Sequence, residues 1–145
     1  MKFAAITTVL ALVFGYSSAQ YNTGDVQLNA SLVQIDDNAK LNFSVFKADI
    51  SVTYGVSETK LDSWSVKLGM KGGDIYLILE MSKILNKQVD DVANVYNANK
   101  KKGWGAIAKE LGIKPGSPEF HALKGGADQQ ATKGKGKSKP KGKKN

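Results

Sequence analysis

The chain has 145 residues, and its 21 basic residues, all of them lysines, face 13 acidic residues for a net charge of +8. Seven of the lysines lie within residues 133–145, where no acid occurs, and an eighth is Lys2. The residues between these ends are therefore charge-balanced, which excludes a body that is basic throughout, as in many nucleic-acid-binding proteins. The absence of cysteine excludes disulfides and thiolate chemistry.

The first residues are typical of a cleavable signal peptide. Lys2 is followed by an apolar run over residues 3–16, and Ser17 and Ala19 place small residues at the positions required for a cut after Ala19. The run is shorter than the roughly 20 apolar residues of a membrane span. We predict a signal peptide over residues 1–19 and an exported protein, periplasmic or secreted, with no transmembrane segment after signal removal.

Residues 20–124 are predicted to form an all-α domain, a small bundle of five to six helices with short loops. From Leu28 to Tyr54 the apolar residues are three or four positions apart, which favours one long helix over residues 25–54. The same stretch also alternates as two strands around residues 36–38 would. An N-terminal β-hairpin followed by helices is therefore the alternative.

The next two predicted helices have clear start signals. Ser57 can cap a short helix whose buried face is Leu61, Trp64 and Leu68. Asp74 can cap the following helix, which is apolar on most sides and therefore belongs at the centre of the bundle.

The later helices are also marked by charge and capping residues. One helix carries Asp90 and Asp91 in its first turn and lysines 100–102 in its last, which match the helix macrodipole. A short helix then begins at Trp104. Ser117 caps a final helix of one or two turns, and residues 125–132 are predicted to be a linker.

Residues 133–145 alternate lysine with small residues and contain nothing to bury, so we predict a disordered Lys/Gly-rich tail. Its lysines can follow a polyanion nonspecifically, through counterion release. The candidate partners are anionic lipid, polysaccharide and nucleic acid, and the alternative is a solubilising extension without a partner. The predicted polyanion-binding residues are Lys133, Lys135, Lys137, Lys139, Lys141, Lys143 and Lys144.

Residues 103–123 contain the consecutive segments Gly-Trp-Gly, Ile-Ala-Lys, Leu-Gly-Ile-Lys-Pro-Gly-Ser and Glu-Phe-His. This block resembles the C-terminal block of a family of small, uncharacterised exported bacterial proteins, and the likeness extends over most of residues 28–124. The resemblance implies a bacterial, exported protein and supports the helical prediction for the first half. It implies no activity.

Candidate recognition residues are Trp104, Phe120 and His121, for which packing in a core corner is the alternative role. Ser117 and His121 share a helix face, as a nucleophile and its base would, but the sequence shows no orienting acid. A capping Ser117 and a half-buried His121 against Trp104 are therefore favoured. A single histidine and no cysteine exclude a zinc or copper site of His and Cys ligands, and we predict no metal, no cofactor and no catalytic residue.

Residues 104–123 also have the shape of a helix-turn-helix, but the second helix offers no Arg or Asn for base edges, so a structural corner is favoured. The sequence thus predicts a non-catalytic binding or structural module of the bacterial envelope with a polycationic tail. The alternatives are a small enzyme acting on an envelope polymer, and nucleic-acid binding through the corner and the tail. A pocket with two converging carboxylates would favour the enzyme.

Overall fold

The computed structural model describes residues 21–134, and within that range the protein contains helices and no strand. The predicted signal peptide, and the tail beyond Gly134, lie outside the described residues. The helices are α1 (Val26–Leu41), α2 (Phe43–Tyr54), α3 (Glu58–Lys67), α4 (Gly72–Leu85), α5 (Val89–Asn99), the 3-10 helix η1 (Lys100–Lys102), α6 (Trp104–Glu110) and α7 (Pro118–Lys133).

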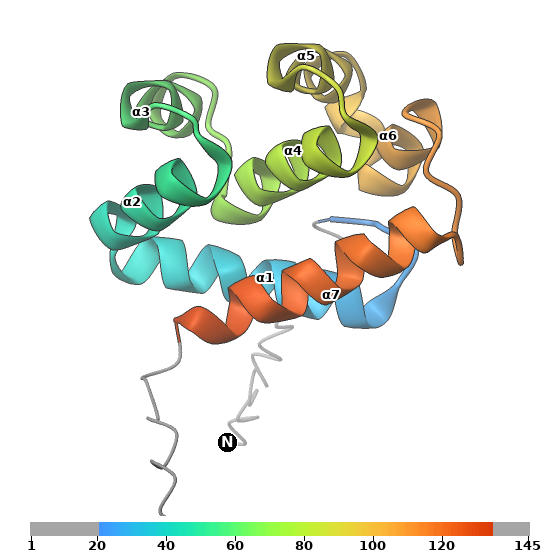
Figure 1. The fold of residues 1–145 in the computed structure, drawn as a ribbon, viewed down its shortest axis with the longest axis horizontal. Coiled ribbons are helices and arrows are strands. Elements are labelled where there is room, and N and C mark those ends of the chain that lie inside the picture. Colours follow the sequence, from blue (N-terminus) through green and yellow to red (C-terminus); the bar gives the residue numbers. More distant parts are fainter. Residues whose placement is uncertain (1–20, 135–145) are drawn as a thin grey trace, which may run out of the picture.

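The bundle is built around α4 (Figure 1). Helices α1 and α7 lie side by side along one side of α4, with α2 and α3 near its start and α5 and α6 beyond its other side. Every residue of α4 from Ile75 to Ser82 is buried, which confirms the predicted central helix. Each fully buried large apolar side chain there contributes about 2 kcal/mol to folding. None of the described helices is long and apolar enough to cross a membrane.

The predicted helical pattern in the first half is confirmed, but the single helix over residues 25–54 is wrong because the chain breaks at Asn42. The Asn42 N–H donates to the Asn38 carbonyl and closes α1, while its side chain accepts from the Val45 N–H and opens α2. Asparagine favours such capping positions over a helix interior. This break accounts for a seventh α-helix. The β-hairpin alternative is wrong, since residues 36–38 lie inside α1.

Two details of the following helices also differ from the prediction. Ser57 does cap α3 by accepting from the Lys60 N–H, but Leu68 follows the helix end and is 45% exposed. Asp74 is not the cap of α4. It lies in the first turn, where its Oδ2 accepts from the Lys71 N–H at 3.0 Å.

The predicted linker over residues 125–132 is wrong, because these residues are the second half of α7. Ala127 and Ala131 are buried in the core, and Asp128 accepts hydrogen bonds from Ser31 and Gln27 of α1. Small residues let α7 approach its neighbours closely, so that contacts with α1 and α4 hold a sequence of low helix propensity in helical form.

Candidate functional site

Residues 21–24, which we name the N-terminal strap, pack against the start of α6. The Trp104 N–H donates to the Tyr21 carbonyl and the Gly105 N–H to the Asn22 carbonyl, both at 2.9 Å. The first N–H groups of a helix have no carbonyl partner within that helix. The strap supplies these partners and thereby fixes the position of Trp104.

The Tyr21 side chain anchors the strap in the core. Its hydroxyl donates to Oδ1 of Asp36 at 2.5 Å, and the Gly73 N–H donates to the same oxygen at 2.7 Å. Burial raises the pKa of Asp36, although both hydrogen bonds act in the opposite direction. This contact joins the strap to α1 and to the first turn of α4.

Three glycines make room for the strap. A Cβ on Gly73 would collide with the Tyr21 hydroxyl, and a Cβ on Gly103 or Gly105 would lie 2.9 Å from an atom of Asn22. Gly103 also has a φ of 90°, in the region that favours glycine. The strap therefore packs directly against the Gly-Trp-Gly segment.

The Trp104 side chain has one polar partner and one aromatic partner. Its indole Nε1–H donates to Oδ1 of Asp74 at 2.9 Å, and its ring stacks on Tyr96 with centroids 5.1 Å apart. Burial, together with the Asp74 carboxylate, raises the pKa of the Tyr96 hydroxyl above its ordinary value. Both oxygens of Asp74 thus accept hydrogen bonds, since Oδ2 binds the Lys71 N–H.

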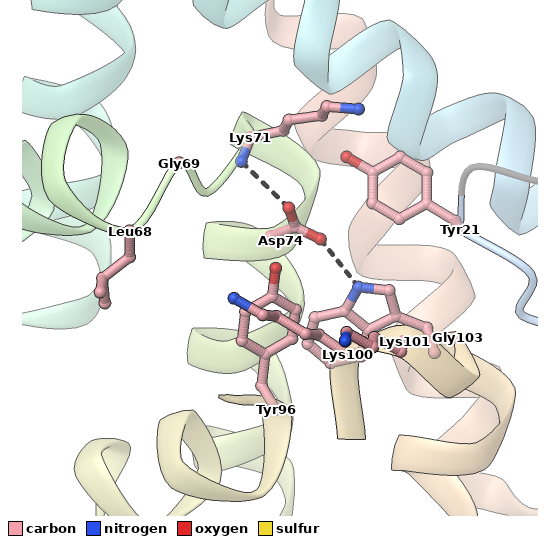
Figure 2. A pocket seen from close by; sticks show the side chains of 10 residues that line it. Tyr21, Leu68, Gly69, Lys71, Asp74, Tyr96, Lys100, Lys101 and Gly103 are labelled. Carbon is pink, nitrogen blue, oxygen red and sulfur yellow. Dashed lines mark hydrogen bonds between the residues drawn. The ribbon is translucent and has the colours of Figure 1, made fainter. Parts of the chain in front are cut away.

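A pocket of about 300 Å³ opens at this junction (Figure 2). Its volume is at the lower end of the range for small-molecule sites. Its walls come from the strap, the turn before α4, the first turn of α4, the end of α5, η1 and the start of α6. The lining residues are Tyr21, Leu68, Gly69, Lys71, Asp74, Tyr96, Lys100, Lys101, Gly103 and Trp104.

We name Lys71, Lys100 and Lys101 the pocket lysines. All three are exposed, and none forms a salt bridge to an acid of the described chain. Five other lysines do pair with acids, namely Lys47, Lys60, Lys83, Lys124 and Lys133. Three positive charges against the single carboxylate of Asp74 make the pocket attractive to anions, and more so at low salt.

The pocket lacks the paired carboxylates expected for the enzyme alternative. Asp74 is the one acid among the lining residues, and both of its oxygens are occupied. Within residues 21–134 no group of three or more potential metal-ligating side chains comes together. The lining is therefore three lysines, one carboxylate and the aromatic side chains of Tyr21, Tyr96 and Trp104.

The structure separates the three candidate recognition residues. Trp104 and Phe120 are 3% and 9% exposed and pack in the core, and Trp104 also lines the pocket. The expectation of a half-buried His121 is wrong, because it is exposed at the start of α7. Ser117 is a cap, as predicted: its Oγ accepts from the Phe120 N–H at 3.1 Å.

The corner between α6 and α7 does not have helix-turn-helix packing. Within the described chain α6 packs against α5, whereas α7 packs against α1 and α4. The second helix, α7, is also much longer than predicted, with 16 residues.

Of the predicted tail lysines, Lys133 belongs to α7 and pairs with Asp49 at 3.3 Å, and the others lie outside the described residues.

The pocket is not predictable from the local sequence. The charge pattern places lysines 100–102 at the end of a helix, and nothing in the local sequence connects them to Lys71 or to the strap. The one available signal is the pair of glycines flanking Trp104, which indicates a close backbone approach.

No protein-family profile, no curated protein and no solved structure significantly matches the chain.

Proposed function

We propose that the protein is a non-catalytic, exported module of the bacterial envelope that binds anionic groups through two sets of lysines. The first set is the tail, whose lysines offer nonspecific contact with anionic lipid, polysaccharide or nucleic acid. The second set is the three pocket lysines, which hold one anionic group at the mouth of the pocket.

The observation that carries this proposal is the arrangement of Lys71, Lys100 and Lys101 around one pocket without a salt bridge to any described acid. An alternative role for Lys100 and Lys101 is to complement the negative end of α5. That role does not involve Lys71, which lies before the start of α4. Anion binding accounts for all three residues.

Retention on immobilised heparin at increasing salt tests the proposal. We expect deletion of residues 135–145 to lower the eluting salt concentration strongly, because six lysines are lost. Lys133 is kept, since it pairs with Asp49 in the folded body. In the shortened chain, Lys100→Gln with Lys101→Gln should lower the eluting salt concentration further.

The matched control replaces Lys109 and Lys114 with Gln, since these exposed lysines do not line the pocket. It removes the same charge and should have a smaller effect than the pocket pair. Equal effects of the two pairs would refute a role for the pocket. Unchanged elution after the tail deletion would refute a role for the tail.

A further inference from the structure

Seven large apolar side chains are exposed on the described part of the chain, and two of them lie on α2. These are Val45 and Val52, which are 64% and 86% exposed. Ala48, between Val45 and Val52, is exposed as well. We name these three residues the outer face of α2. Leu41, the last residue of α1, is 83% exposed close by in the sequence. Single exposed apolar residues are ordinary, but a row of them marks a contact surface.

The outer face follows from helical geometry. Val45 and Val52 are seven residues apart, which is nearly two full turns, so their side chains point the same way. Phe46 and Ile50 of the same helix are buried in the core. A surface helix normally turns polar residues to solvent. On α2, Val45, Ala48 and Val52 instead turn apolar side chains to the solvent, beside the exposed Ser44 and Thr53.

The described part of the chain ends near this face. Lys133, in the last turn of α7, pairs with Asp49 of α2, and the Asn38 amide donates to the Ala131 carbonyl at 2.9 Å. Figure 1 shows the end of α7 below α2, at the same end of the molecule. Residues 135–145 then add six lysines.

The tail is long enough to act together with the outer face. Eleven residues span at most roughly 40 Å when extended, whereas the 12 residues of α2 form a helix about 18 Å long. The fully extended length of residues 135–145 therefore exceeds the length of α2.

We propose that the outer face of α2 and the tail together dock the protein on an anionic lipid bilayer. The inference rests on the proposed function of the tail and names its partner. Apolar side chains would enter the boundary between headgroups and acyl chains, while the lysines bind anionic headgroups. A polysaccharide or a nucleic acid would use the lysines but not the outer face. The outer face also has no aromatic residue or Arg of the kind that dominates protein interfaces.

Co-sedimentation with vesicles tests this docking. The protein is the chain from Gln20 onward, because the apolar run over residues 3–16 would itself enter lipid. We expect binding to vesicles of phosphatidylcholine with phosphatidylglycerol, and weak binding to phosphatidylcholine alone. Val45→Gln with Val52→Gln should weaken the binding to anionic vesicles roughly tenfold. Deletion of residues 135–145 should weaken it at least roughly 100-fold.

The matched control replaces Val26 and Val66 with Gln. These residues are 87% and 81% exposed but lie off the outer face, so their replacement should leave vesicle binding unchanged. Neither pair is in the core, and unchanged thermal unfolding would confirm that both variants fold. Heparin retention of the Val45/Val52 variant should equal that of the unmodified chain, since heparin offers no apolar layer.

Val45→Trp adds a direct probe of insertion. The native Trp64 and Trp104 are 5% and 3% exposed, so the new indole reports on the outer face alone. Its emission should shift to shorter wavelength with anionic vesicles. Vesicle binding unaffected by the Val45/Val52 pair, or absence of this shift, would overturn the docking while the tail proposal stands. Vesicle and heparin binding both unaffected by the tail deletion would overturn both proposals.

Discussion

The hydroxyl of Tyr21 donates a hydrogen bond to Oδ1 of the buried Asp36 at 2.5 Å, and this contact ties the start of the domain to its core. The Tyr21 carbonyl meanwhile accepts from the Trp104 N–H. Tyr21 thereby connects the strap to α1 and to the start of α6, and the Gly73 N–H, which donates to the same Asp36 oxygen, adds the first turn of α4. These contacts position the strap, α4 and α6 at the pocket.

Tyr21→Phe is expected to destabilise the domain. The substitution keeps the ring but removes a donor to a buried carboxylate, which costs about 2 kcal/mol in the free energy of unfolding. Urea unfolding at neutral pH measures the loss. A change below about 0.5 kcal/mol would show that the hydroxyl contributes little.

Asp36 should give the stability a distinctive pH dependence. Burial raises its pKa in the folded state, so the folded chain binds this proton more tightly than the unfolded chain does. The free energy of unfolding contributed by Asp36 therefore falls as the pH rises from the ordinary aspartate pKa through the raised one. An asparagine side chain at this position could accept from the same two donors through its amide oxygen without ionising.

Asp36→Asn is therefore expected to remove this part of the pH dependence and to gain stability relative to the unmodified chain as the pH rises. Urea unfolding of both chains between about pH 4 and pH 7 gives the difference. Other titrating groups are common to both chains and cancel. Parallel stability curves would contradict the assignment.

Gly73→Ala is expected to release the strap. The new Cβ would collide with the Tyr21 hydroxyl, and the buried ring has no room to move aside, so the free energy of unfolding should fall by about 2 to 3 kcal/mol. The Trp104 and Gly105 N–H groups would then lose their partners. The amide hydrogen exchange of Trp104 and Gly105 should become faster. Unchanged exchange at both residues would refute the claim that Gly73 makes room for the strap.

Two adjacent glycines test the second half of α7. A Cβ on Gly125 meets nothing within 4 Å, whereas a Cβ on Gly126 would lie 2.5 Å from the Tyr76 hydroxyl oxygen. Gly125→Ala should stabilise the protein by about 0.5 to 1 kcal/mol, since alanine favours a helix. Gly126→Ala should destabilise it by about 2 kcal/mol. A flexible linker at these positions would instead leave thermal unfolding unchanged in both variants.

Local signals explain which helices were predictable from the sequence. Ser57 and Ser117 cap through their own side chains, and the buried spacing from Leu28 to Ile50 survives the break between α1 and α2. The apolar spacing does not reveal the break, because Asn42 interrupts the hydrogen bonding without interrupting that spacing. Only one residue separates α1 from α2, which is too short a segment for composition to reveal.

The pocket and the length of α7 depend on contacts between distant residues. The Ser31 hydroxyl donates to the Asp128 carboxylate, and Gly126 lies against Tyr76, so a segment rich in glycine and glutamine is held as a helix. Lys71 and Lys101 line the same pocket because α4 and α5 pack against each other. Periodicity and capping signals describe single helices and do not predict contacts between residues that are far apart in the sequence.

The most direct test of the account is a titration of the chain from Gln20 to Gly134 with pyrophosphate, followed through its two tryptophan indole N–H signals by NMR. The Trp104 indole lines the pocket next to the pocket lysines, whereas Trp64 lies on the buried face of α3 and does not line the pocket. We predict a saturable shift of the Trp104 signal with little change at Trp64. The apparent affinity should fall at least about fivefold in the Lys100→Gln, Lys101→Gln variant. A Trp104 signal that does not move, or that moves equally in this variant, would contradict anion binding at the pocket.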